Sequence, residues 1–239
     1  MSDAPPVTPQ QRKLSEGGLS SYKSLVCGDS SWIQFVLFEA VQLFTFGLPG
    51  VLGLGLRSLL IRHFLKACGT RPAIGSNVTF RGTSEISFGN KVFIEDFATI
   101  DAREKSSIAL GDFVSVGRHS IVAAKGGIVE LRSGSNIGSF CRIATQSKVT
   151  IGESTLIAGY CYIGPGNHKR NSADGTFISG EMDIKGGVSI GSNVWVGTRT
   201  TILDGVSIGD GAIVGAHSLV TEDVAPGAVV AGVPAKPLK

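Results

Sequence analysis

The sequence predicts a mainly β fold, a parallel β-helix built from six-residue repeats. Two observations predict it: apolar residues recur at intervals of six from Ile74 onward, and glycine accounts for 33 of the 239 residues, about twice its ordinary share. A helix would place apolar residues three and four apart, and an ordinary strand would alternate by two without a longer period. A period of six with a turn in each unit indicates a short strand, a corner and another short strand, wound into a coil.

The apolar positions that recur every six residues, called anchors here, fall in sets of three because three units complete one triangular coil. The anchors are Ile74, Phe80, Phe88, Ile94, Ile100, Leu110, Val116, Val122, Leu131, Ile137, Ile143, Ile151, Ile157, Ile163, Ile190, Val196, Ile202, Ile208, Val214 and Val220. Anchors of successive coils should stack into one continuous core, to which each buried aliphatic side chain contributes roughly 1.5–3 kcal/mol.

The spacing between coils shows where residues are added to the repeat. The coils that begin at Phe88, Leu110 and Leu131 each exceed three repeats by a few residues, and the coil after Ile151 begins only at Ile190. All additions follow the third anchor of a coil, so they belong to one edge of the triangle. The largest addition, residues 167–187, predicts one long projecting loop, and such insertions mark the binding face of repeat proteins.

The chain divides into three segments. Residues 1–30 are polar and proline-rich, which predicts a flexible tail and not a signal peptide. Residues 31–70 predict an apolar, amphipathic helical segment, and residues 71–239 form the β-helix domain.

In the helical segment, the polar residues between Trp32 and Leu48 share one side of a helix. Pro49 and the glycines around it should end this helix, with a second one over residues 56–66. No stretch offers twenty unbroken apolar residues, which argues against a transmembrane helix. Residues 31–66 either lie in a membrane interface or cap the open end of the β-helix. Basic residues after the apolar hairpin favour the membrane interpretation.

Charge and cysteine usage exclude several classes of function. The net charge is +3, and no basic run is interleaved with aromatic residues, so a nucleic-acid partner is not expected. The four cysteines lie far apart in the sequence, which predicts reduced thiols in a cytoplasmic protein. Any two of the four histidines are at least 49 positions apart, whereas a histidine zinc site needs two ligands at close spacing. No metal is expected.

His168 is the candidate catalytic base, because it stands in "GPGNHKR", where the regular coil ends and the projecting loop begins. An imidazole suits this role since its unperturbed pKa lies near the working pH. The alternative is an ordinary solvent-exposed loop histidine. The neighbouring Asn167, Lys169 and Arg170 could hold a saccharide hydroxyl or an anionic acceptor, or could simply be solvated loop residues. His119 and His217 both occupy the third place after an anchor, which predicts surface or corner positions.

From Ile74 to Lys239 the sequence resembles the hexapeptide-repeat acyltransferases, most closely over residues 188–239, "VSIGSNVWVG…AGVPAKPLK". The resemblance implies left-handed winding of the β-helix, acetyl-CoA as co-substrate and a homotrimer with active sites between subunits. It also implies that His168 is the catalytic histidine, since relatives carry theirs at the matching place.

The same resemblance assigns residues to the coenzyme. Trp195, Gly197 and Thr198 would line the pantetheine channel, with a backbone N–H near Thr198 as an oxyanion donor. The further coenzyme positions are Gly215, Ala216 and Thr221 along the pantetheine arm, and Lys236 and Lys239 at the nucleotide phosphates. Glu222 stands where relatives usually have lysine, and His217 where glycine is usual, which puts those individual contacts in doubt.

The resulting hypothesis is an acetyl-CoA-dependent O-acetyltransferase that acetylates a saccharide hydroxyl in surface-polysaccharide biosynthesis. It would act in the cytoplasm or on the inner face of the cytoplasmic membrane, where the acceptor could be lipid-linked. Two alternatives stay open: an N-acetyltransferase acting on an amino sugar, a sugar nucleotide or an antibiotic, and a non-catalytic β-helix assembly protein.

Overall fold

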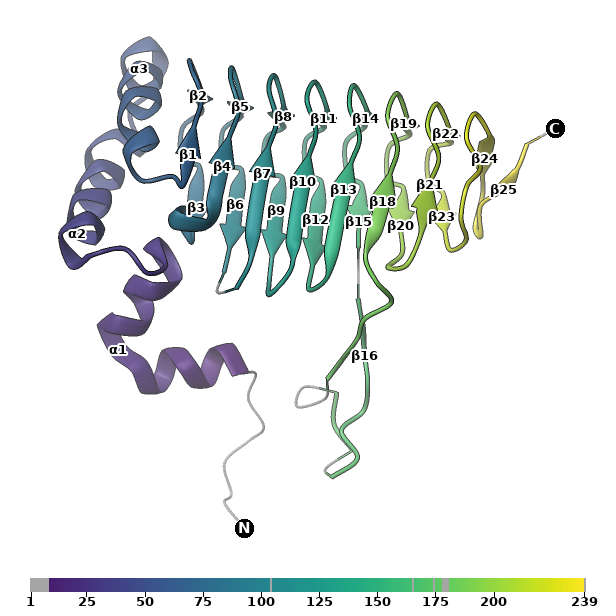
Figure 1. Cartoon of the computed structure of the whole chain (residues 1–239), viewed down its shortest axis with the longest axis horizontal. Coiled ribbons are helices and arrows are strands. Elements are labelled where there is room, and N and C mark those ends of the chain that lie inside the picture. Colours follow the sequence, from purple (N-terminus) through teal and green to yellow (C-terminus); the bar gives the residue numbers. More distant parts are fainter. Residues whose placement is uncertain (1–8, 104, 165, 174, 178–180, 239) are drawn as a thin grey trace.

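The computed structural model describes residues 9–103, 105–164, 166–173, 175–177 and 181–238. Helices occupy the N-terminal end of the molecule, a triangular parallel β-helix follows, and one loop projects from an edge of the triangle (Figure 1). The predicted fold class, mainly β with an N-terminal helical segment, is confirmed.

The β-helix consists of three sheets, named A, B and C here. Sheet A contains β1 (Ala67–Cys68), β4 (Ile86–Phe88), β7 (Ser107–Leu110), β10 (Ile128–Leu131), β13 (Lys148–Ile151), β18 (Val188–Ile190) and β21 (Ser207–Ile208). Sheet B contains β2 (Ala73–Ile74), β5 (Phe93–Ile94), β8 (Ser115–Val116), β11 (Asn136–Ile137), β14 (Leu156–Ile157), β19 (Trp195–Val196), β22 (Ile213–Val214), β24 (Val229–Ala231) and β25 (Lys236–Pro237). Sheet C contains β3 (Thr79–Arg81), β6 (Thr99–Ala102), β9 (Ile121–Ala124), β12 (Arg142–Thr145), β15 (Tyr162–Ile163), β20 (Thr201–Ile202) and β23 (Leu219–Val220).

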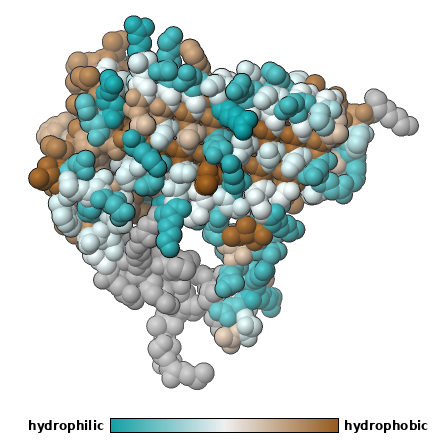
Figure 2. Space-filling model, viewed as in Figure 1, coloured by the Kyte–Doolittle hydropathy of each residue, from teal (hydrophilic) through white to brown (hydrophobic). Residues whose placement is uncertain are grey.

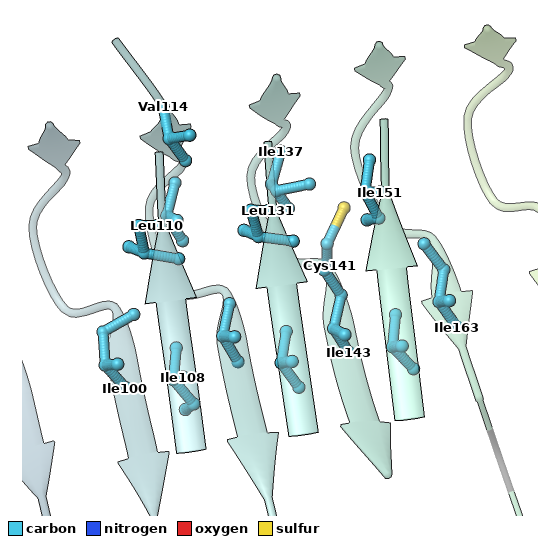
Figure 3. Packing of buried hydrophobic residues seen from close by; sticks show 14 of the residues in the cluster. Ile100, Ile108, Leu110, Val114, Leu131, Ile137, Cys141, Ile143, Ile151 and Ile163 are labelled. Carbon is cyan, nitrogen blue, oxygen red and sulfur yellow. The ribbon is translucent and has the colours of Figure 1, made fainter. Parts of the chain in front are cut away.

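The anchors form the core in the predicted register. Every one of them is buried, and the strand pairing stacks like positions directly, as in Leu110 on Leu131 and Ile151 on Ile190. Figure 3 shows the same kind of side chain pointing inward from coil to coil.

The residues between anchors follow from the corner geometry. The third residue after an anchor has a positive φ at most corners, for example 60° at Phe97, 56° at His119 and 58° at His217. Non-glycine residues rarely adopt this conformation, and it points their side chains outward. The predicted corner positions of His119 and His217 are therefore confirmed.

The residues added to each coil do not form separate loops. They lengthen strands on both sides of the edge between sheets C and A, where β6, β7, β9, β10, β12 and β13 each have four residues. Among the described residues, only those of the addition over residues 167–187 leave the coil, as Figure 1 shows, and they include the antiparallel pair β16 (Asn167–His168) and β17 (Met182–Asp183).

The N-terminal segment contains α1 (Pro9–Cys27), α2 (Trp32–Val41), the π-helix η1 (Gln42–Phe46), α3 (Gly50–Leu60) and η2 (Ile61–His63), and a further short helix, η3 (Thr83–Glu85), lies within the β-helix. The expected flexible tail is wrong for residues 9–27, because Val26 and Cys27 at the end of α1 are buried and the N–H of Gly82 donates to the carbonyl of Val26. Residues 1–8 lie outside the described part. The second apolar helix begins at Gly50 and not at residue 56, since only Gly47–Pro49 interrupts the helical path.

These helices cap the first coil. Phe38, Phe46 and Ile61 are buried, and the Phe46 ring meets the Phe80 ring edge-on at 6.2 Å between centroids. The guanidinium of Arg57, itself only 2% exposed, donates hydrogen bonds to the carbonyl oxygens of Ile74 (2.9 Å), Thr45 (2.8 Å) and Leu48 (2.6 Å). The capping interpretation is therefore correct for one side of the segment.

The other side of the helical segment is apolar and exposed. This apolar face comprises Ile33, Val36, Leu37, Leu43, Phe44, Val51, Leu52 and Leu59, and Figure 2 shows hydrophobic surface gathered at this end of the molecule. None of the helices in the described part of the chain is both long and apolar enough to span a bilayer.

Candidate active site

A hollow lies where the projecting loop leaves the β-helix. Sheet C supplies its floor with Ala144 and Gly164, and the loop supplies one wall with His168 and Met182. The site therefore lies at the edge between sheets C and A, where the sequence predicts a binding face.

Local backbone constraints place His168 at this hollow. Gly164 has a φ of 76°, and a Cβ there would lie 2.8 Å from the carbonyl oxygen of Ala144, so the chain leaves sheet C at a position that excludes a side chain. The strand β16 then pairs with β17, with His168 opposite Met182. The imidazole is exposed and lines the hollow, so a bound hydroxyl can approach it.

The residues beside His168 belong to the loop itself. Asn167 pairs with Asp183 across β16 and β17, and the Lys169 ammonium lies 3.3 Å from the Asp183 carboxylate. The Arg170 guanidinium lies over the Phe177 ring at 4.9 Å. The structure brings none of these three predicted substrate residues to the lining of the hollow, and their role in acceptor binding stays a prediction.

The predicted coenzyme residues lie together on a different edge. Trp195 of β19 is 52% exposed on sheet B, and Gly197 and Thr198 form the corner that leads to sheet C. Gly215 and Ala216 form the same corner one coil later, so close that a Cβ at Gly197 would lie 2.5 Å from the Ala216 nitrogen. The Thr198 hydroxyl donates to the Gly159 carbonyl (2.7 Å).

The remaining coenzyme positions lie near the C-terminus. Thr221 directly follows β23, and Lys236 opens β25. The ammonium of Lys236 lies 3.4 Å from the carboxylate of Glu222, the residue that departs from the resembled pattern. Lys239 lies outside the described residues.

The width of sheet C separates the two groups of predicted site residues. His168 lies at the edge between sheets C and A, whereas Thr198 lies at the edge between sheets B and C. One chain alone therefore does not bring the imidazole to the predicted pantetheine channel.

The sequence analysis missed several residues of the hollow. Arg142 and Tyr162 line it from sheet C, together with Lys125, and the Arg142 guanidinium lies over the Tyr162 ring at 6.0 Å. Asp204 accepts hydrogen bonds from the backbone of Lys185 (2.6 Å) and Gly187 (2.8 Å), which fixes the return of the loop to the coil. Arg142 and Tyr162 each precede an anchor, so counting outward positions on successive coils could have found them.

The cysteines are placed as structural residues. Cys141 and Cys161 are buried, and their thiols donate to the carbonyls of Ala158 and Gly197. The hydrogen bond with Cys161, and then burial, raise the pKa of Cys141, and burial raises the pKa of Cys27 to about 11. The thiolate is the nucleophilic form, and none of the four thiols lines the hollow in the described part of the chain. Across those same residues, no group of His, Cys, Asp and Glu is arranged to hold a metal ion.

Comparison with known proteins agrees with the repeat pattern. The family model for bacterial transferase hexapeptide (six repeats) matches residues 187–222. The dTDP-4-amino-4,6-dideoxy-D-glucose acyltransferase of Escherichia coli is 30% identical over 174 residues, which cover 72% of this chain and 81% of that protein. A protein of Escherichia coli K12, named for O-acetyl transfer in lipopolysaccharide biosynthesis, is 33% identical over 144 residues, which cover 57% of this chain and 74% of that protein. The chain belongs to the hexapeptide-repeat acyltransferases.

Two further proteins show the same relationship. A Mycobacterium tuberculosis protein named as an acetyltransferase is 31% identical over 170 residues, and the chain spans about half (49%) of its length. The crystal structure of the polySia specific acetyltransferase NeuO superposes with a TM-score of 0.52 at 27% identity, over 72% of this chain and 80% of that one. In this hexapeptide-repeat acyltransferase the residues matched by the family model lie in the β-helix domain.

Proposed function

We propose that this acyltransferase is an acetyl-CoA-dependent O-acetyltransferase, which acetylates a saccharide hydroxyl in surface-polysaccharide biosynthesis. The observation that carries the proposal is the exposed imidazole of His168, lining a hollow at the base of the projecting loop. Two relatives support the substrate class, because one is named for O-acetyl transfer in lipopolysaccharide biosynthesis and one for an acyltransfer to a dTDP-linked amino sugar.

The chemistry needs a base, an oxyanion donor and alignment of two substrates. His168 accepts the proton of the acceptor hydroxyl while the acceptor oxygen attacks the thioester carbonyl of acetyl-CoA. The backbone N–H near Thr198 donates to the oxyanion of the tetrahedral intermediate. The carbon–sulfur bond then breaks, His168 returns its proton to the thiolate of coenzyme A, and the acetyl ester forms. No acyl-enzyme is needed, in keeping with the buried thiols.

The direct test is acetyl transfer from labelled acetyl-CoA to matched acceptors. We expect product with a hydroxyl-only oligosaccharide, and mass spectrometry should find one acetyl group as a base-labile ester. Turnover restricted to 4-amino sugar nucleotides, with a base-stable amide as product, would establish the N-acetyltransferase alternative. A protein that binds saccharide but never turns over acetyl-CoA would support the non-catalytic alternative.

We further propose that the active protein is a homotrimer. The separation of His168 from Thr198 within one chain supports this, since a second copy can supply the missing edge. An exposed aromatic ladder along the edge between sheets B and C also supports it, because large apolar surfaces mark contact sites. The ladder comprises Phe97, His119, Phe140 and Tyr160, stacked at 4.9 Å between successive centroids.

Mixing two inactive variants tests the shared site. His168→Ala and Thr198→Arg should each be inactive alone, whereas trimers reassembled from equal amounts should recover about a quarter of wild-type activity if each site draws on two chains in cyclic order. Light scattering should give three times the 24.8 kDa chain mass. A monomer, or mixtures that stay inactive, would contradict the proposal.

We also propose a cytoplasmic location with peripheral contact to the inner face of the membrane, where the acceptor would be lipid-linked. The apolar face on α2, η1 and α3 supports this, as does the nearby basic group of Arg62, His63 and Lys66. Such a surface buries apolar side chains in the interface while cations meet anionic lipid.

Charge introduced into the apolar face tests membrane contact. Leu43→Glu with Phe44→Glu should abolish co-sedimentation with vesicles of anionic lipid, because these side chains are 77% and 70% exposed and contribute little to the core. The melting temperature should not fall. Phe113→Glu, at a corner of the β-helix where the side chain is 58% exposed, is the control and should leave vesicle binding intact. Equal loss in both variants would exclude a specific role for the helices.

A further inference from the structure

A second hollow lies on the outer face of sheet C, beside the one that contains His168. It runs across β3, β6, β9 and β12, over a floor that includes Ala123, only 1% exposed. The register continues this floor of small side chains, because Ala144 of β12 lies next to Ala123 of β9. Lys125 and Arg142 line both hollows, so the two adjoin at these side chains; together they are called the groove here, and His168 lies at one end of it.

The walls of the groove are strongly basic. Arg81, Arg103, Lys125 and Arg142 line the second hollow, where Asp101 is the one carboxylate among the described lining residues, while Asp204 lines the hollow of His168. The Asp101 carboxylate is committed to one neighbour, since the Arg103 guanidinium donates to it at 2.8 and 2.9 Å. In the described part of the chain, no further carboxylate lines the second hollow to neutralise Arg81, Lys125 or Arg142.

The cations also affect one another. Partial burial, and then the charges of Arg103 and Arg142, lower the pKa of the Lys125 ammonium, although Asp101 opposes the effect. A bound anion would relieve this repulsion. Anionic ligands are consequently favoured along the groove, whereas neutral ligands gain no electrostatic stabilisation there.

The spacing of the cations selects the kind of anion. They extend over four adjacent strands, β3 to β12, or about 14 Å at the usual distance between strands. A single diphosphate group reaches only the nearest one or two of them. Anionic groups repeated along an extended chain can meet all of them at once.

We propose that this groove binds an acidic oligosaccharide segment of the acceptor and leads one of its hydroxyls to His168. The inference rests on the proposed acetyl transfer to a saccharide and adds that the saccharide is anionic over several sugar units. Arg81, at the far end, contacts the chain remote from the reacting hydroxyl, whereas Arg142 and Lys125 hold the part next to it.

Binding measurements on the full-length His168→Ala protein test the groove independently of catalysis. We use hexagalacturonate as the acidic probe, maltohexaose as the neutral probe and UDP-glucose as a glycosyl diphosphate. Hexagalacturonate should bind, and Arg81→Gln should lower its affinity about fivefold, as expected for the loss of one partly exposed ion pair. Maltohexaose should show no binding that depends on Arg81, and UDP-glucose should be insensitive to Arg81→Gln.

Two further variants separate binding from folding and from general charge. Lys125→Gln should lower the affinity for hexagalacturonate about as much as Arg81→Gln does. It should leave the melting temperature unchanged or raise it, because it removes repulsion between Lys125 and the neighbouring arginines. Arg132→Gln, an exposed cation outside the groove, should change nothing. Equal effects of Arg132→Gln and Arg81→Gln, or binding of UDP-glucose alone, would overturn the proposal. Groove-dependent binding without any acetyl transfer would instead overturn only the proposed enzyme activity.

Discussion

The variant His168→Ala should lose acetyl transfer by a factor of about 10²–10⁴, the usual contribution of a positioned general base. The loss should fall on kcat, because the imidazole acts on the proton that moves during attack and the rest of the hollow stays in place. The fold should be unaffected, since the side chain is exposed on a loop strand and contributes nothing to the anchored core. Initial rates with saturating acetyl-CoA measure the effect.

A matched histidine distinguishes this result from a general effect of substitution. His63 is also exposed but lies on η2, among the N-terminal helices, so His63→Ala should keep the full rate in solution. Full activity of His168→Ala would remove the catalytic base from the proposal. It would leave the non-catalytic assembly protein as the better interpretation of the same fold.

The variant Arg57→Leu should lower the free energy of unfolding by at least ~2 kcal/mol. Removing the guanidinium takes a donor from three backbone carbonyls. The Thr45 carbonyl keeps the N–H of Leu48, and a buried group left unsatisfied costs about 1–3 kcal/mol. Leucine avoids the cost of burying a charge, which offsets part of this loss. The loss of donors to these carbonyls should outweigh that gain, because the carbonyls remain in place in the helical cap and in the first coil.

Denaturant unfolding with a matched control checks this prediction. Arg62→Leu replaces an exposed arginine of the same segment and should change the unfolding free energy by less than ~0.5 kcal/mol. An unchanged midpoint for Arg57→Leu would mean that the helices cap the β-helix through apolar packing alone.

The β-helix could be predicted almost completely from the sequence, because its core repeats one short rule. An anchor every six residues fixes which side chains are buried, and the pairing of Ile94 with Val116 shows that the same rule fixes the pairing of strands.

The N-terminal segment has no such repetition. The helix over residues 9–27 depends on a few contacts at its end, such as the hydrogen bond to Gly82, which composition does not reveal. Gly53 lies inside α3, where a side chain would collide with the Leu48 carbonyl, so this glycine does not end the helix.

The candidate site was only partly predictable for a related reason. His168 could be selected as a candidate because the interruption of the six-residue repeat beside it can be read directly from the sequence. The cations Arg81, Arg103, Lys125 and Arg142 are up to sixty-one positions apart in the sequence and come together only because successive coils stack them. His168 and Thr198 lie at different edges of one chain, so the second chain of the proposed trimer, which no pattern within one chain determines, would have to bring them together.

Each end of the stacked coils is closed in its own way, and this limits how the protein can aggregate. At the C-terminal end, β25 pairs with β24 in the antiparallel sense, so sheet B no longer ends in a parallel strand. At the opposite end, the helices held by Arg57 cover the first coil. Open strand edges template pairing with another chain, so the helical cap and the reversed last strand of sheet B both disfavour the addition of copies end to end.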